Sequence, residues 1–175
     1  ARILKQETEA EVGCYLLKPR DEDEEVFTAA RDAGVFIAVA GDDQRWRVLK
    51  NLVSAADVLV DALLGTGARL PVEGDLLKLL QTAAGALERD PCGRDADDPG
   101  RRGWPAAPLP AESPGPVVVA VDCPSGLDND SGELDPATIS ADVTVTFAAA
   151  KVGQLTFPGA AACGDLVVAG IGTPH

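Results

Sequence analysis

Short apolar runs alternate with amphipathic segments along most of this chain. The apolar runs predict strands over residues 12–17, 35–40, 58–63, 117–121, 143–147 and 166–169. Between them, helical spacing of apolar positions predicts helices over residues 1–10, 21–33, 43–54 and 71–87. Strands that alternate with helices indicate an α/β protein with a doubly wound, mostly parallel sheet.

Two of these predicted strands end in an acid that is followed by a turn. The sequence VVVAVDCPSG over residues 117–126 stops at Asp122, and DVLVDALLGTG over residues 57–67 carries Asp61 near its end. Ligands of open α/β sheets bind beyond the carboxyl ends of the strands. We therefore expect Asp61 and Asp122 to lie at the same edge of the sheet.

Each candidate also has a purely structural interpretation. Asp61 is equally compatible with capping the following turn, and Asp122 with an Asx turn. The Gly65–Thr66–Gly67 turn can direct N–H groups at an anion, although any tight turn prefers glycine. Arg69 suits a phosphate, but most arginines are solvated. For Lys151, which follows the strand over residues 143–147, a surface position is favoured over one facing the edge.

Charge and composition exclude several classes of protein. The 175 residues fit one domain, and the net charge of −13 argues against a nucleic-acid or anionic-membrane surface. No apolar stretch is long enough for a membrane span, and no signal peptide is present. The single histidine, His175, is terminal, which excludes a Ser-His-Asp triad and disfavours zinc. Four dispersed cysteines without a CxxC pair indicate a reducing, cytoplasmic setting.

Residues 90–116 break the alternating pattern. They hold seven of the thirteen prolines and predict an irregular inserted loop, in which Trp104 either pins the loop or serves as a contact. The chain contains no methionine, so we expect it to be part of a longer polypeptide.

Four segments in order resemble one known family. They are DALLGTGARLP at 61–71, VAVDCPSGLDNDSGE at 119–133, ADVTVTFAAAKVG at 141–153 and GDLVVAGIG at 164–172. As an ordered set they resemble the YjeF N-terminal family, the NAD(P)HX epimerases, whose vertebrate members are also called apolipoprotein A-I-binding proteins. The resemblance covers nearly the whole chain except the insertion, so residues 1–175 are expected to form one domain of this type.

The resemblance implies a three-layer αβα Rossmann-like sandwich, a potassium ion (K⁺) and a damaged nicotinamide cofactor as substrate. It implies potassium ligands at Asp61 and Ser125, and a catalytic, substrate-contacting acid at Asp122. It implies that the substrate-binding loop comprises Gly65, Thr66, Gly67, Ala68, Arg69, Leu70 and Pro71.

One part of the family pattern is missing from this sequence. The family has a strand and an N-N-G-G-D-G loop before the helix that begins this chain, and that loop supplies a further potassium ligand. The strand is central in the family's sheet. The resemblance therefore implies an amino-terminally truncated domain with a gap beside the strand over residues 58–63, and a homodimer for the full-length protein.

The leading hypothesis is an isomerase that interconverts the R and S forms of hydrated NADH or NADPH, with Asp122 as general acid and base. This role predicts a raised pKa for Asp122, provided by burial and opposed by the cation. The alternatives are a non-catalytic nucleotide- or protein-binding module, one half of an enzyme fused to an ATP- or ADP-dependent NAD(P)HX dehydratase, and a nucleotide-binding enzyme of other chemistry.

Overall fold

The structure of this chain is a computed structural model that describes residues 1–21, 24–67, 69–87 and 115–172. Nearly all of the expected insertion over 90–116, with Trp104, therefore lies outside the described residues. The chain divides into two compact units, Ala1–Leu52 and Val53–His175. No helix in the described part of the chain is both long and apolar enough to cross a bilayer.

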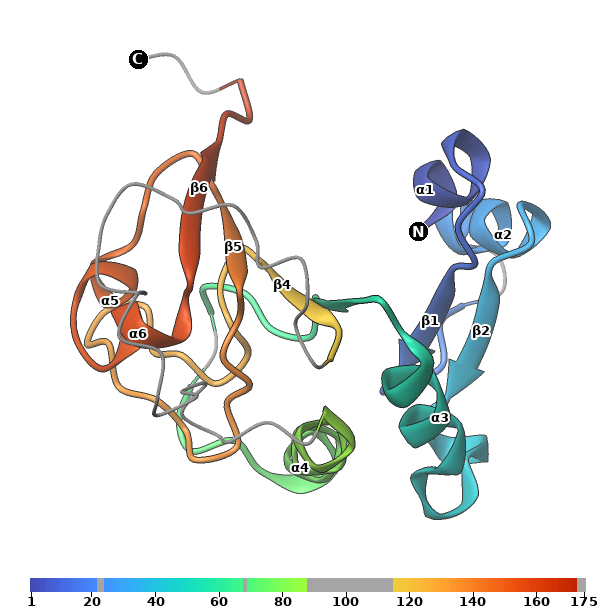
Figure 1. Cartoon of the computed structure of the whole chain (residues 1–175), viewed down its shortest axis with the longest axis horizontal. Helices are drawn as coiled ribbons and strands as arrows, with labels where there is room; N and C mark the ends of the chain where they lie inside the picture. Colours follow the sequence, from blue (N-terminus) through green and yellow to red (C-terminus); the bar gives the residue numbers. More distant parts are fainter. Residues whose placement is uncertain (22–23, 68, 88–114, 173–175) are drawn as a thin grey trace. The chain divides into compact units, whose positions relative to one another are not determined.

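The first unit is built around a pair of parallel strands. Its elements in chain order are α1 (Arg2–Glu7), β1 (Gly13–Leu16), α2 (Glu25–Asp32), β2 (Phe36–Val39) and the start of α3 (Arg47–Ala55) (Figure 1). β1 pairs with β2 in register from Gly13 with Phe36. Asp43 caps the start of α3, because its carboxylate accepts the N–H groups of Val48 and Leu49 at 3.0 Å.

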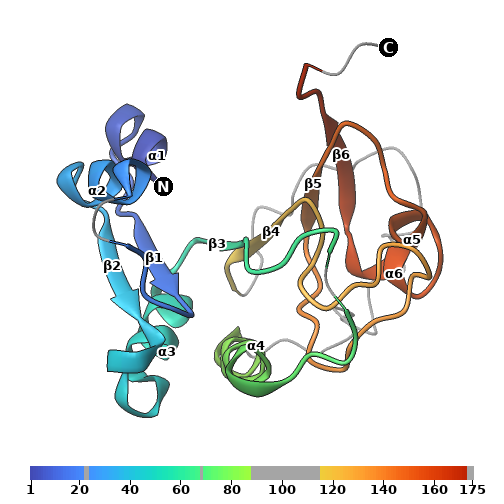
Figure 2. The same ribbon diagram turned by 180° about the vertical axis from the view of Figure 1, so that it is seen from behind.

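The second unit holds a four-stranded sheet. Its elements in chain order are β3 (Val58–Asp61), α4 (Gly74–Leu87), β4 (Val117–Val121), β5 (Val143–Phe147), α5 (Val152–Leu155), α6 (Gly159–Ala162) and β6 (Asp165–Ala169). The strands pair in the order β3-β4-β5-β6, and every pairing is parallel. Figure 2 shows α5 and α6 next to each other and apart from α4.

Side chains alternate between the two faces of each central strand, and those on one face are buried. Val118 and Ala120 of β4 are fully buried, as are Thr144 and Thr146 of β5. α4 contributes an apolar stripe at helical spacing, formed by Leu79, Leu80, Ala83 and Leu87. The buried hydroxyl of Thr144 donates to the carbonyl of Cys163 at 2.6 Å, so this polar group is satisfied inside the core.

The α/β class with parallel strands is confirmed, and two local expectations are wrong. α4 begins at Gly74 rather than at Pro71, because the φ of +66° at Gly74 interrupts a helical path, and the segment before it is held by the N–H of Val72, which donates to the Asp135 carboxylate at 2.8 Å. α5 and α6 were not predicted, since four-residue helices carry no readable period. The strands of the described residues form two sheets, and β3 is an edge strand of the second.

Candidate functional site

β3 and β4 bring the two predicted acids to the same edge of the sheet. The register pairs Asp61 at the end of β3 with Ala120, two residues before Asp122. Ser125, three residues after Asp122, then turns back onto Asp61. Its N–H donates to Asp61 Oδ2 at 2.7 Å and its hydroxyl to Oδ1 at 2.6 Å. The expected convergence at one edge is therefore what the structure shows.

Asp61 is a buried carboxylate, and only 6% of the residue is exposed. Oδ1 also accepts the N–H of Leu63 at 3.3 Å, so the capping interpretation describes part of its role. Burial raises the pKa of Asp61, and the hydrogen bonds from Ser125 oppose that rise. Among the described residues, no lysine or arginine forms an ion pair with Asp61.

The turn after β4 holds Ser125 in place. Its hydroxyl is fully buried and accepts the N–H of Leu64 at 3.1 Å, which ties the segment after β3 to the turn after β4. Gly126 has a φ of +99°, and a Cβ there would collide with the Thr138 hydroxyl. Glycine at position 126 is thus a steric requirement of this turn.

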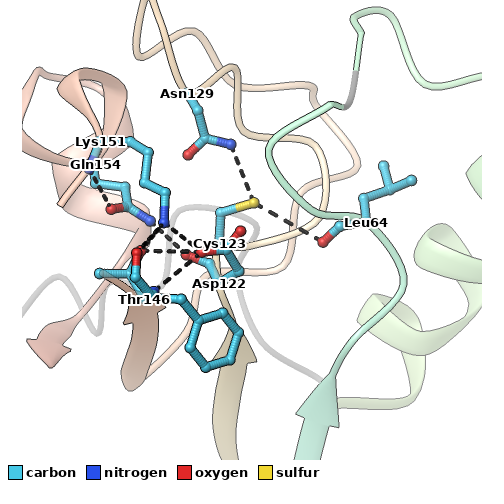
Figure 3. Close-up of polar contacts among 8 residues, drawn as sticks. Leu64, Asp122, Cys123, Asn129, Thr146, Lys151 and Gln154 are labelled. Atoms are coloured by element: carbon cyan, nitrogen blue, oxygen red, sulfur yellow. Dashed lines mark hydrogen bonds and ion pairs between the residues drawn. The ribbon is translucent and has the colours of Figure 1, made fainter. Parts of the chain in front are cut away.

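One oxygen of the Asp122 carboxylate is fixed by three donors. Oδ1 accepts Lys151 Nζ at 2.5 Å, the Thr146 hydroxyl at 3.2 Å and the Phe147 N–H at 3.3 Å. Figure 3 shows the Lys151 and Thr146 side chains directed at this carboxylate. All three donors come from β5 or the segment that follows it, so the Asx-turn interpretation of Asp122 is wrong.

Lys151 is not the surface residue that the sequence favoured. Its Nζ donates to Asp122, to the Thr146 hydroxyl at 2.6 Å and to the Phe147 carbonyl at 3.1 Å, and its side chain is only 21% exposed. Lys151 begins the Lys-Val-Gly sequence that ends the family-like segment over residues 141–153, but spacing alone does not distinguish it from a surface lysine.

The predicted rise in the pKa of Asp122 is also wrong. Burial alone raises the pKa, but the hydrogen bond and positive charge of Lys151, with the N–H of Phe147, outweigh it and lower the pKa below its ordinary value. Asp122 is therefore a carboxylate at neutral pH, with an ammonium group as its neighbour.

The other carboxylate oxygen of Asp122 is open. Among the described residues nothing donates a hydrogen bond to Oδ2, and a Cβ placed on Gly65 would lie 3.8 Å from it. The segment after β3 thus passes beside this oxygen at a residue without a side chain. An anchored carboxylate with one free oxygen is a geometry suited to proton transfer.

The predicted substrate loop lies mostly on the surface. Gly65, Thr66, Gly67, Arg69 and Pro71 are exposed, Leu70 is half-buried, and Ala68 lies outside the described residues. Arg69 makes no ion pair within the described part of the chain. Of its two glycines, Gly65 lies beside the Asp122 carboxylate, whereas a Cβ on Gly67 would meet no atom within 4 Å.

Comparison with known proteins identifies the family. The profile described as "YjeF-related protein N-terminus" matches residues 1–153. The chain belongs to the YjeF N-terminal family. The resemblance read from the ordered motifs is thereby confirmed, since the match includes the segments that follow β3, β4 and β5.

Curated relatives of this YjeF N-terminal chain are named as epimerases or repair enzymes of NAD(P)H hydrate. A protein of Rhodopirellula baltica named NAD(P)H-hydrate epimerase is 30% identical over 83% of this chain and 46% of its own length. One of Clavibacter sepedonicus with the same name is 36% identical over 82% of this chain and 53% of its own. A "Bifunctional NAD(P)H-hydrate repair enzyme Nnr" of Thermofilum pendens is 33% identical over 82% and 22% respectively. The chain spans about half or less of the length of these relatives.

A solved structure supports the fold. The crystal structure of yeast ynu0 matches this YjeF N-terminal chain with a TM-score of 0.59 at 18% identity, over 89% of this chain and 53% of the yeast chain. At that identity the likeness establishes the α/β, Rossmann-like fold class, and the strand pairing described above agrees with it.

Proposed function

We propose that this chain carries the epimerase site of an NAD(P)H-hydrate repair enzyme, which interconverts the R and S epimers of hydrated NADH and NADPH. The single observation that carries the proposal is the Asp122 carboxylate, with Oδ1 fixed by Lys151 and Oδ2 open beside Gly65. Two relatives named NAD(P)H-hydrate epimerase support the assignment to this substrate.

Epimerisation requires the enzyme to give one proton to the substrate and to take one back. The hydroxyl-bearing ring carbon is bonded to the ring nitrogen. When its C–O bond breaks, the electron pair leaves with the hydroxyl, which takes a proton and departs as water. The nitrogen lone pair forms a C=N⁺ bond. Water then adds to the opposite face and loses a proton, and the electron pair returns to nitrogen.

Asp122 and Lys151 are suited to hold that proton. The ion pair holds its proton on Lys151 at rest, gives a proton through the Asp122 carboxylate to the departing hydroxyl and then takes one back from the incoming water, so the pair is unchanged after one turnover. Because Lys151 lowers the pKa of Asp122, the ionised carboxylate is the resting form. The glycines of the 65–67 turn leave room for the nicotinamide and its pyrophosphate beside this edge.

A potassium ion belongs to the same proposal, with Asp61 and Ser125 as its ligands. They offer a carboxylate and a hydroxyl, the oxygen donors that a hard cation prefers. The buried Asp61 carboxylate has no basic partner among the described residues, which fits a site for a positive ion. When bound, potassium would offset the charge of Asp61 and of the substrate pyrophosphate.

The cellular setting and partners are also proposals. Three of the four cysteines (Cys14, Cys123 and Cys163) are free thiols, which supports a cytoplasmic location. The bifunctional relative of Thermofilum pendens supports a fused NAD(P)HX dehydratase domain in the whole protein. We also propose that residues 1–175 form a domain of this type and that the full-length protein is a homodimer.

The activity is tested with one purified epimer of hydrated NADH. We expect the chain to bring S-NADHX to the equilibrium mixture of epimers faster than buffer does, as followed by chromatography. We expect a slower approach when potassium chloride is replaced by choline chloride at equal ionic strength. Binding of the hydrate without any acceleration would instead support the non-catalytic nucleotide-binding module.

A further inference from the structure

The side-chain amide of Gln154 joins the backbones of the two residues that form the ion pair. Its Nε2 donates to the carbonyl oxygen of Asp122 at 2.6 Å, and its Oε1 accepts the N–H of Lys151 at 2.9 Å (Figure 3). Gln154 is only 2% exposed, so water does not substitute for either bond without entering the core.

Asp122 needs such support because its backbone is in an unfavourable conformation. Its φ is +70°, in the left-handed region that residues other than glycine rarely adopt. Its N–H is held by the Val145 carbonyl at 2.8 Å, as an extension of the sheet. Its carbonyl is held by the Gln154 side chain instead. Without that bond this half-buried residue loses one of the two backbone hydrogen bonds that hold its left-handed conformation.

The element that carries Gln154 is itself fixed. The N–H of Gly153 donates to the Asn129 carbonyl at 2.7 Å, and a Cβ on Gly153 would collide with the Asp128 carbonyl. α5 is therefore packed against the segment that follows the Asp122 turn. The amide of Gln154 sits on a rigid support, which suits a residue that sets the position of others.

An amide meets both requirements at this place at any pH. A donor is needed toward Asp122 and an acceptor toward Lys151, and glutamine supplies both while uncharged. An ionised glutamate of the same shape would place a carboxylate oxygen against the carbonyl oxygen of Asp122, so two acceptors would face each other. A methionine would supply neither a donor nor an acceptor.

We propose that Gln154 is a positioning residue, which holds the backbones of Asp122 and Lys151 so that their side chains meet as an acid–base pair. This inference deepens the proposed function and rests on it for its effect on turnover. Its structural part concerns only the Asp122–Lys151 contact and does not depend on the substrate.

The test compares the chain with Gln154→Met and with Gln81→Met, an exposed glutamine on α4 that serves as the matched control. The titration of the Asp122 side-chain carboxyl is followed by ¹³C NMR. We expect its midpoint to move up toward the ordinary value in Gln154→Met, because Lys151 is displaced, and to stay unchanged in Gln81→Met. We expect kcat for epimerisation to fall about 100-fold in Gln154→Met with little change in KM.

A second variant separates positioning from loss of packing. In Gln154→Glu the Lys151 bond is retained, and burial raises the pKa of the new carboxyl. We expect kcat to be low at neutral pH and to recover as the pH falls, because the protonated carboxyl then donates to Asp122. A merely structural role would leave the shape of the pH profile unchanged.

The experiments distinguish failure of the positioning role from failure of the proposed function. An Asp122 midpoint that is the same in the wild type and in folded Gln154→Met, or a flat pH profile for Gln154→Glu, would overturn the positioning role. A shifted midpoint in a chain whose wild type does not epimerise the hydrate would overturn the proposed function and leave the positioning role in place.

Discussion

Asp122→Asn is expected to reduce the epimerisation rate by about 100-fold or more while the chain stays folded, since general acid–base groups contribute factors of this size. Asparagine keeps the shape of the side chain, and its oxygen still accepts the three donors that hold Oδ1. It has no carboxylate to take a proton from water. The measurement is the initial rate of S-NADHX conversion, with folding checked by circular dichroism.

The matched control for this variant is Asp130→Asn. Asp130 is an exposed residue of the turn over residues 129–131. Its side chain makes no hydrogen bond or ion pair among the described residues. We expect its rate to equal that of the wild type. An Asp122→Asn rate within twofold of this control would remove Asp122 from the chemistry.

The second large effect is on stability. Asp61→Ala is expected to lower the free energy of unfolding by about 3 kcal/mol, because it leaves buried donors without an acceptor. These donors are the N–H and hydroxyl of Ser125 and the N–H of Leu63. Urea unfolding followed by circular dichroism measures the change, in a potassium-free choline buffer so that cation binding does not contribute.

Asp57→Ala is the control for Asp61. Asp57 is exposed just before β3, and its contribution to the sheet is a backbone carbonyl that accepts the Val117 N–H at 2.9 Å. We expect a change within about 0.5 kcal/mol. Equal effects of the two substitutions would show that Asp61 does not hold the turn after β4.

The strands and the edge on which the acids lie were predictable because their signals are local. A continuous apolar run defines β4, alternating valine and threonine define β5, and parallel strands place their carboxyl ends together. Asp61 and Asp122 follow directly from that rule. The bounds of β5 agree with the prediction at both ends.

The partners of these acids were not predictable from local patterns. Lys151 and Gln154 lie 29 and 32 residues beyond Asp122, and only the fold of α5 brings them to it. The direction of the Asp122 pKa shift was therefore predicted wrongly, since burial could be inferred but the ammonium neighbour could not. The start of α4 was missed for a similar reason, because Asp135, which holds Val72, is 63 residues away.

The central claim is that hydrated nicotinamide cofactor binds at the edge where β3, β4 and β5 end. The most direct measurement is an amide ¹H–¹⁵N NMR titration of the chain with one epimer of hydrated NADH. The account predicts that the largest shifts occur at Gly65 and Phe147, beside the Asp122 carboxylate, and at Gly67 of the proposed substrate loop. Shifts confined to the first unit, Ala1–Leu52, with these three signals unmoved, would contradict it.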